Sequence, residues 1–496
     1  MTDTTAKPIE TQAPPVVTQP HNRRRIAANF LVMTITNLLI LVIGMFTGAY
    51  SRRMLGPVPI GQVGWNVAVL AYLGLIVSPG LQMVGQREIA KTPAETAQLT
   101  SVVITLQLLF AVAAYMVIFA IAAVDLRGPV ISLLLILQSA SLLITALDVR
   151  WVMQAHERMV GPSVANLVVN LAQVPALVLL VRRPEDVYVY VVFTIPFSLA
   201  GLAYNFWYLR RHGSVRLRQL RPDLGGARKL LRESWPFALS QGAILLYYNG
   251  GAIILGFAAG DEPVGLYSTA YKLMMVSQVV SLAMWNAYFP VLTRAHAVPA
   301  EASRVAAEFA TLMAWMGLPM AALGWAVGRH AVVLLYGGDF ALAGAYFEWL
   351  CLNVGLVFLN IGLGLPLLTW GFQKYQLWMT APVGLANLAV NLVLIPVYGA
   401  WGAVATTLGA EFVIFFLTIR ARRRIGVGWH PIVPIIAAPI LCSTAVALAL
   451  ALLPDAWDRY WWLELAAGAS VLGGCLFIFE RRILSGALQL VRGRPG

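Results

Sequence analysis

The chain has 496 residues, of which 59% are hydrophobic and only 11% are charged. Soluble domains carry about 25% charged residues, so this composition excludes an ordinary soluble protein and predicts one embedded in a lipid bilayer. The formal net charge of +13 is high enough for a nucleic-acid-binding protein. Membrane proteins, however, retain Lys and Arg on the cytoplasmic side, and this explains the excess without nucleic acid.

Residues 1–22 are rich in Thr, Pro and Gln, and we expect them to form a disordered cytoplasmic tail. Apolar stretches of nearly membrane-spanning length, which is about 20 residues, then fill residues 26–480. They predict fourteen transmembrane helices and an all-α, polytopic fold. We expect helices near 26–49, 60–84, 100–123, 129–149, 161–181, 187–209, 235–258, 264–291, 305–328, 345–369, 376–397, 400–419, 431–453 and 461–480.

The positive charges test this count of helices. With the N-terminus inside, the cytoplasmic segments hold 27 of the 35 Lys and Arg residues and the outer loops hold seven. The remaining one, Lys272, lies within an expected helix. This asymmetry is what the positive-inside rule requires, and it predicts a multi-pass protein of the cell membrane with both termini in the cytoplasm.

An internal repeat relates the two halves of the chain. Asn166 and Asn170 in the fifth expected helix are followed by a proline at the same spacing as Asn387 and Asn391 in the eleventh. The second and eighth helices also open alike, with Pro59-Ile60-Gly61 and Pro263-Val264-Gly265. Because six helices separate the copies, the repeats run in parallel, related by an axis along the membrane normal. Such Asn pairs can also serve only as packing contacts between helices.

This repeat predicts the division of the chain into lobes. We expect a six-helix N-terminal lobe at 23–209, a basic cytoplasmic linker at 210–234 and a six-helix C-terminal lobe at 235–420. Residues 421–496 would hold two additional helices and a cytoplasmic tail. Two such lobes enclose a central cleft, and rocking of one against the other would give alternating access.

Charged residues within the expected spans are the first candidates for a site. Lys272 lies about two turns from the outer end of its helix, where it must pair, face water in the cavity or snorkel to the interface. Arg52 and Arg53 close the first helix on the outer side and could bind either lipid headgroups or an anionic substrate. Glu411 in the twelfth helix could pair with a cation or relay a proton.

Other chemistry is not encoded in a recognisable pattern. The sequence has no Gly-x-x-x-x-Gly-Lys-[Ser/Thr] phosphate loop, and its six His residues are scattered in tails and loops. Cys351, Cys442 and Cys475 lie in apolar stretches without the spacing of metal ligands, and we expect them to be small buried hydrophobes. We therefore expect no catalytic residue, no cofactor and no metal site.

Several motifs resemble those of one family. They are Arg53-Met54-Leu55-Gly56-Pro57, Gln86-Arg87-Glu88-Ile89-Ala90, His156-Glu157-Arg158-Met159, the stretch from Val264 to Leu273, and above all the stretch from Asn391 to Ala403. With these motifs, residues 23–480 resemble a polysaccharide transporter of the oligosaccharide-flippase type. That group belongs to the superfamily that also contains the multidrug (MATE) exporters and the lipid II flippase.

The resemblance implies translocation of a polyprenyl-diphosphate-linked oligosaccharide for surface polysaccharide biosynthesis. It implies contacts with membrane lipids and with glycan polymerase or glycosyltransferase machinery. It also adds Asn249 to the candidate cavity residues, because this residue opens the family's Asn-x-Asp motif. Here Gly251 stands where that motif often has Asp, so neither ion coupling nor the pairing of a cavity cation can operate through this position.

Two other functions are compatible with the sequence. A cation-coupled exporter of drugs or metabolites, from the same superfamily, would need acidic residues in its cavity, whereas most candidates here are basic. A membrane enzyme that polymerises or transfers glycans would usually carry catalytic acids on a large loop or a cytosolic domain. The longest loop here, 210–233, is basic, so we expect a transporter and not an enzyme.

Overall fold

The computed structural model describes residues 23–212, 215, 220–426 and 432–451. These residues form seventeen α-helices and no strand. The helices are α1 (Arg23–Leu55), α2 (Pro57–Val77), α3 (Leu81–Lys91), α4 (Thr96–Val124), α5 (Pro129–Gln138), α6 (Ala140–Ala146), α7 (Arg150–Ala155), α8 (Val160–Leu180), α9 (Val187–Val192), α10 (Thr194–Arg211), α11 (Ala227–Ala259), α12 (Asp261–Ala295), α13 (Pro299–Tyr336), α14 (Ala341–Thr369), α15 (Gln373–Tyr398), α16 (Ala400–Ile425) and α17 (Ile432–Ala451).

Twelve segments of the described chain are long and apolar enough to cross a membrane, and they coincide with the first twelve expected helices. Three of these segments are broken where one straight helix was expected: α2 and α3 form the second, α5 to α7 the fourth, and α9 with α10 the sixth. Helix α17 matches the thirteenth, and the expected helix at 461–480 lies outside the described residues. The all-α, polytopic membrane fold is confirmed.

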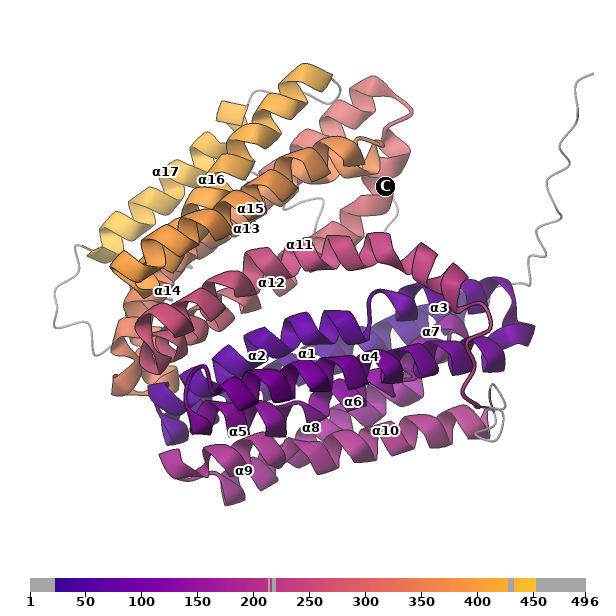
Figure 1. The fold of residues 1–496 in the computed structure, drawn as a ribbon. Coiled ribbons are helices and arrows are strands. Elements are labelled where there is room, and N and C mark those ends of the chain that lie inside the picture. The colour runs from indigo at the N-terminus through magenta and orange to yellow at the C-terminus, as the bar shows by residue number, and fades with distance from the viewer. Residues whose placement is uncertain (1–22, 213–214, 216–219, 427–431, 452–496) are drawn as a thin grey trace, which may run out of the picture.

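The helices form two packed groups (Figure 1). We call α1–α10 the first helix group and α11–α17 the second. Helices α11 and α12 lie between α2 and the rest of the second group, and α2 packs against both of them. The lobe boundaries at 23–209, 210–234 and 235–420, and the symmetry between the lobes, stay predictions.

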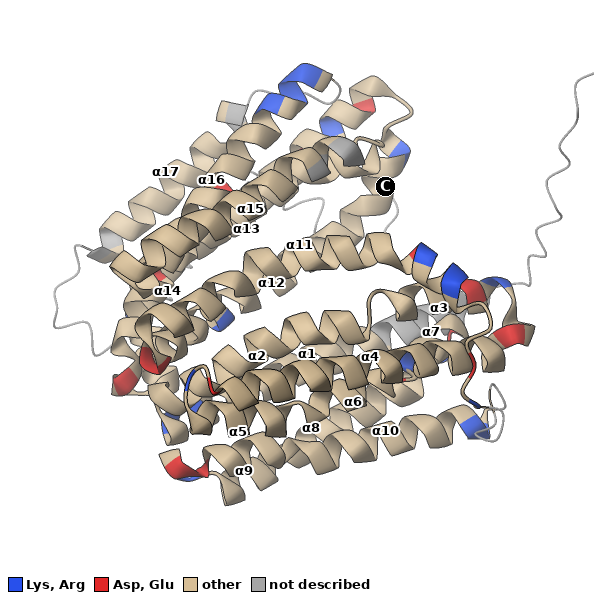
Figure 2. Ribbon diagram, viewed as in Figure 1, with Lys and Arg blue, Asp and Glu red and all other residues tan. Residues whose placement is uncertain are grey.

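Charged residues gather at the two ends of the helices, and few lie between (Figure 2). Arg210 and Arg211 end α10, Arg228 begins α11, and Arg422–Arg424 end α16. We call this the basic end of the protein, and the other the opposite end. Basic residues that end or begin successive helices on one side fit the orientation predicted from the positive-inside rule.

The two groups meet most closely where α2 crosses α12 near the opposite end. A Cβ added to Gly61 would overlap the carbonyl oxygen of Asp261, and one added to Gly265 would overlap the carbonyl oxygen of Pro57. The contact is reciprocal: Gly61 of α2 lies against Asp261 of α12, and Gly265 of α12 lies against Pro57 of α2. These glycines belong to the repeated Pro-x-Gly motifs, so the repeat serves close approach of two backbones within the membrane.

The core contains the large side chains of Phe309, Phe340 and Phe358, which are fully buried in the second group. Cys351 and Cys442 are also buried, as the sequence predicted. The prediction for Cys475 lies outside the described residues.

Candidate functional site

Arg52 joins the two helix groups near the opposite end. Its side chain is only 6% exposed, and its Nε donates a hydrogen bond of 2.9 Å to Thr269 Oγ1 on α12. The guanidinium also lies 5.3 Å from the centre of the Tyr336 ring on α13. Its Nη1 donates to the carbonyl oxygen of Gly48, one turn earlier on α1, at 3.1 Å. These partners occupy two of the five N–H donors of the guanidinium, so it keeps donor capacity for a further acceptor.

Lys272 lies one helical turn beyond Thr269 on α12, and its side chain is exposed. Residues spaced in this way project from the same face of a helix, so the structure brings Lys272 and Arg52 to neighbouring positions. Arg53 points elsewhere: its side chain is exposed and donates to the carbonyl oxygen of Leu334 on α13. The structure thus groups two of the three candidate cations and separates the third.

Glu411 is buried in the second helix group, with 7% of its surface exposed. Its carboxylate accepts hydrogen bonds of 2.6 Å from the hydroxyl of Tyr247 on α11 and from Nδ2 of Asn360 on α14. All three residues line a cavity of about 530 Å³, which we call the second-group cavity. Most of its other walls are apolar or aromatic, and Tyr248 and Trp285 belong to them.

Asn249 follows these tyrosines on α11 and is half-buried, but it is not among the residues that line the second-group cavity. The neighbouring Gly251, where the resemblance expected an Asp, faces α15: a Cβ there would lie 3.8 Å from Nδ2 of Asn391. Among the described residues, no hydrogen bond or ion pair joins Asn249 or Glu411 to Lys272.

The repeated Asn pairs differ between the two halves. On α15, Asn391 donates to Asn387 at 2.9 Å and accepts from the hydroxyl of Thr406 at 2.5 Å, while Asn387 donates to the Thr406 carbonyl oxygen. This closed network supports the packing interpretation for the second copy. On α8, Asn170 donates only within its own helix, to the backbone and side-chain oxygens of Asn166.

The first copy of the Asn pair lines a second large space, the first-group cavity, of about 460 Å³. It lies between α3, α6, α7, α8 and α10. This cavity was not predicted from the sequence, in which charged residues and the spacing of the repeated asparagines are the more prominent features. Isolated amides in apolar spans, such as Gln82, Gln173 and Asn205, were the available signal, since polar groups in lipid need partners.

An ion pair also ties the two groups together at the opposite end. Arg127, between α4 and α5, contacts Asp261 at the start of α12 with 2.6 Å between Nη2 and Oδ1. Gln62 donates to the same carboxylate at 3.1 Å. The centre of the Trp65 ring lies 4.8 Å from the guanidinium carbon of Arg127. Burial disfavours the charged form of Arg127 and lowers the pKa of its guanidinium, but Asp261 offsets part of this cost.

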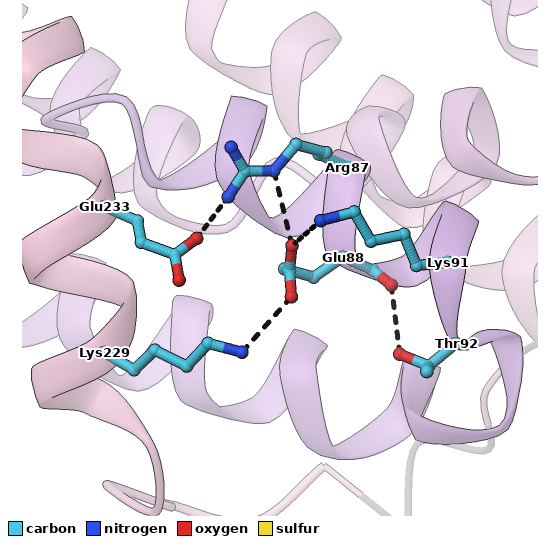
Figure 3. Close-up of polar contacts among 6 residues, drawn as sticks. All are labelled: Arg87, Glu88, Lys91, Thr92, Lys229 and Glu233. Carbon is cyan, nitrogen blue, oxygen red and sulfur yellow. Dashed lines mark hydrogen bonds and ion pairs between the residues drawn. The ribbon is translucent and has the colours of Figure 1, made fainter. Parts of the chain in front are cut away.

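A second charged cluster joins the groups at the basic end (Figure 3). Glu88 on α3 contacts Lys229 on α11 at 3.3 Å and Lys91 at 2.8 Å. Arg87 bridges Glu88 and Glu233, the latter on α11. Arg87 and Glu88 belong to one of the family-like motifs, so part of that motif holds the first turns of α11 on the first helix group.

This cluster predicts a charge-swap experiment. Glu88→Lys should leave Glu233 as the one acid of the cluster among four cations and let α3 and α11 separate. Spin labels at positions 90 and 228 should then report longer distances. The double variant Glu88→Lys with Lys229→Glu should restore the short distance, because the pair is rebuilt with the charges exchanged. Glu95→Lys, at an exposed acid outside the cluster, is the matched control. Equal distances between the two labels in all four proteins would refute the proposal that the cluster holds α3 and α11 together.

Comparison with known proteins identifies the family. A family model described as "Polysaccharide biosynthesis protein" matches residues 26–296, more than half of the chain. The chain belongs to this family. The match runs from α1 to the end of α12, so it includes Arg52, Lys272 and the crossing of α2 with α12.

Two similar proteins add to the family match, one by its sequence and the other by its fold. The chain is 26% identical over 380 residues to a Shigella dysenteriae protein named "Putative O-antigen transporter", covering 75% of this chain and 93% of that protein. Its fold matches that of the lipid II flippase MurJ in an inward closed conformation, with a TM-score of 0.73, 12% identity, and coverage of 92% and 100%. At this identity the second likeness establishes the fold alone. The predicted kinship with polysaccharide flippases is confirmed.

Proposed function

We propose that the protein translocates a polyprenyl-diphosphate-linked oligosaccharide across the cytoplasmic membrane by alternating access, for surface polysaccharide biosynthesis. The observation that carries the proposal is the family match together with Arg52 and Lys272 at the junction of the two helix groups. A diphosphate in the membrane interior needs compensating charge, because an isolated charge at the bilayer centre costs several kcal/mol or more. Guanidinium and ammonium groups supply that charge.

The ties between the helix groups support the alternating-access part of the proposal. Contacts at the opposite end, through Arg127 and Asp261, and at the basic end, through Glu88 and Lys229, each close one side of the junction. Transport would break these ties one end at a time, so that the glycan enters from one leaflet and leaves to the other. The polyprenyl chain would stay in the bilayer, beside the membrane lipids.

A deletion strain tests the function directly. Without the protein, the proposal expects a lipid-linked oligosaccharide to accumulate on the inner leaflet, and a plasmid copy of the gene to restore its export. Purified protein in vesicles should move the same lipid, extracted from the deletion strain, between leaflets without cleaving it. Unchanged glycan export in the deletion strain, or release of free glycan by the purified protein, would refute a flippase. The latter result would indicate an enzyme of the surrounding polymerase or glycosyltransferase machinery.

One observation favours the alternative, a cation-coupled drug or metabolite exporter. Glu411 lines an apolar, aromatic cavity, and the described residues place no Lys or Arg within ion-pair distance of it. A buried carboxylate in such surroundings favours a proton or a cation as its partner. Glu411→Gln should abolish dye or drug efflux if the protein is such an exporter. It should leave transport of lipid-linked oligosaccharide measurable if the flippase proposal is correct.

The orientation of the chain is a separate prediction. We expect both termini and residues 210–233 in the cytoplasm, so that the basic end faces anionic lipid, where each Lys or Arg contributes about 1 kcal/mol. A reporter that is active only in the cytoplasm should therefore be active when it is fused after residue 496. A cysteine at exposed Gly225 should resist a membrane-impermeant reagent in intact cells. Gly128→Cys, which we expect on the outer side, is the positive control for labelling. Labelling of Gly225→Cys from outside would mean that the orientation is the reverse of the predicted one.

A further inference from the structure

The first-group cavity is polar, although it lies within a membrane-spanning helix group. Nine of its fifteen lining residues have polar side chains, and five of these are amides. The five amides are Gln82, Asn166, Asn170, Gln173 and Asn205. The second-group cavity, of similar volume, is lined mainly by apolar and aromatic side chains. The two helix groups therefore offer chemically different spaces to a ligand.

The amides of the first-group cavity have hydrogen-bonding capacity to spare. Asn166, Asn170 and Gln173 share one face of α8, and the bonds from Asn170 to Asn166 stay within that helix. Across the cavity, Asn205 on α10 is only 8% exposed, and its Oδ1 has no hydrogen-bond partner among the described residues. A buried amide oxygen without a partner is unfavourable, so it favours a ligand that donates a hydrogen bond to it. The equivalent pair on α15 shows that this motif can be closed by a threonine; on α8 it is left open.

The charge of the cavity indicates which ligand it suits. Its two charged residues, Asp148 and Arg150, pair with each other, with Arg150 Nη2 lying 2.8 Å from Asp148 Oδ2. Arg150 Nε also contacts both oxygens of Asp148, so the pair is neutral as a unit. A neutral cavity rich in amides does not favour a diphosphate or a cation. It suits a neutral ligand that both donates and accepts hydrogen bonds, as sugar hydroxyl groups do.

The position of the cavity fits this ligand. Gln82 near the start of α3, Asp148 before α7 and Asn205 near the end of α10 place it toward the basic end, away from Arg52 and Lys272. Arg150, whose side chain is 49% exposed, marks its open side. A volume of about 460 Å³ lies within the range of small-molecule sites, and it accommodates one or two sugar rings.

We propose that the first-group cavity is a carbohydrate subsite, in which the amides of Gln173 and Asn205 bind hydroxyl groups of the transported glycan. The proposal rests on the flippase function and divides the substrate between two places. Sugar rings bind in the first helix group toward the basic end, and the diphosphate binds at Arg52 and Lys272. The glycan would meet the subsite first, since the basic end faces the cytoplasm in the orientation proposed above.

Two soluble probes separate the subsite from the diphosphate site. One is the free oligosaccharide, released by mild acid from the lipid that accumulates in the deletion strain, and the other is inorganic diphosphate. Calorimetry on the purified protein in nanodiscs should give a lower affinity for the oligosaccharide in Gln173→Leu and Asn205→Leu. Loss of one hydrogen bond weakens binding by about 3- to 10-fold. Both variants should bind diphosphate like the wild type, whereas Lys272→Ala should show the opposite pattern.

Two further variants test whether oligosaccharide binding depends on the first-group cavity and on its free volume. Gln278→Leu, in the second-group cavity, is the matched control and should bind the oligosaccharide normally. Val169→Trp keeps every amide but fills the first-group cavity, and should abolish oligosaccharide binding. Wild-type oligosaccharide affinity in Gln173→Leu, Asn205→Leu and Val169→Trp, or no binding to the wild type, would overturn the subsite. The flippase function fails separately, if the deletion strain accumulates no lipid-linked glycan.

Discussion

Lys272→Ala is expected to lower the rate of lipid-linked oligosaccharide transport by about 10- to 100-fold. That range corresponds to losing one hydrogen bond from a charged group, about 1.5–3 kcal/mol. Lys272 is suited to this test because its side chain is exposed at the junction, one turn from the Thr269 hydroxyl that holds Arg52. Removing the ammonium should leave expression and membrane insertion unchanged, since no packing contact of the core is lost.

The substitution by arginine separates charge from shape. Lys272→Arg should keep part of the activity, because it preserves the positive charge and changes the geometry. Arg294→Ala, at an exposed cation near the other end of α12, should transport at the wild-type rate and serves as the matched control. The measurement is the initial rate of transport into vesicles at equal protein content. If Lys272→Ala transports normally, Lys272 is only an interfacial anchor and the proposed diphosphate site is wrong.

Arg52 is a less selective test of the same site. It binds Thr269 and faces Tyr336, so Arg52→Ala also removes contacts between α1, α12 and α13. A loss of transport in that variant would combine ligand binding with packing. Arg53, which is exposed and bound to the Leu334 carbonyl oxygen, lies away from Lys272, and its alanine variant helps to distinguish the two arginines.

The membrane-spanning helices could be predicted from the sequence because the bilayer imposes one simple condition. Backbone polar groups in lipid must be satisfied within the segment, so each long apolar stretch becomes a helix. The breaks between α2 and α3 and between α6 and α7 were missed because hydropathy does not record them. At the first break, Gly80 adopts a φ of 77°, and a Cβ there would meet Phe237 and the Ser234 carbonyl oxygen on α11.

The partners of individual side chains could not be predicted in the same way. Arg127 and Asp261 are 134 residues apart, and each alone looked like an ordinary loop charge. The two Asn pairs have identical spacing, yet one is closed by Thr406 and the other lines a cavity. The two pairs differ in the residue that lies next to them on the neighbouring helix, and this depends on how the helices pack. A repeat in the sequence therefore predicted equivalent positions but not equivalent roles.

Gly61→Val is expected to reduce transport to about a tenth of the wild-type rate or less, an effect comparable with overpacking a core by about 1–3 kcal/mol. At this crossing the atom in the way of a side chain is the Asp261 carbonyl oxygen, which belongs to backbone and cannot rotate aside. Helices α2 and α12 would have to move apart, and Gln62 would lose its bond to Asp261. Gly265→Val should act alike, because it meets the Pro57 carbonyl oxygen in the reciprocal position.

The control for helix propensity is Gly409→Val, since Gly409 lies in α16 with nothing within 4 Å of an added Cβ. It should transport normally. Size-exclusion profiles must match the wild type before rates are compared, and Gly61→Ala gives a smaller insertion if the valine variants do not fold. Spin labels at exposed positions 58 and 262 should report a longer distance in Gly61→Val. Normal transport with a lengthened distance would mean that the helix groups can open at this end without loss of function, and closure at the α2–α12 crossing would then not be a step of transport.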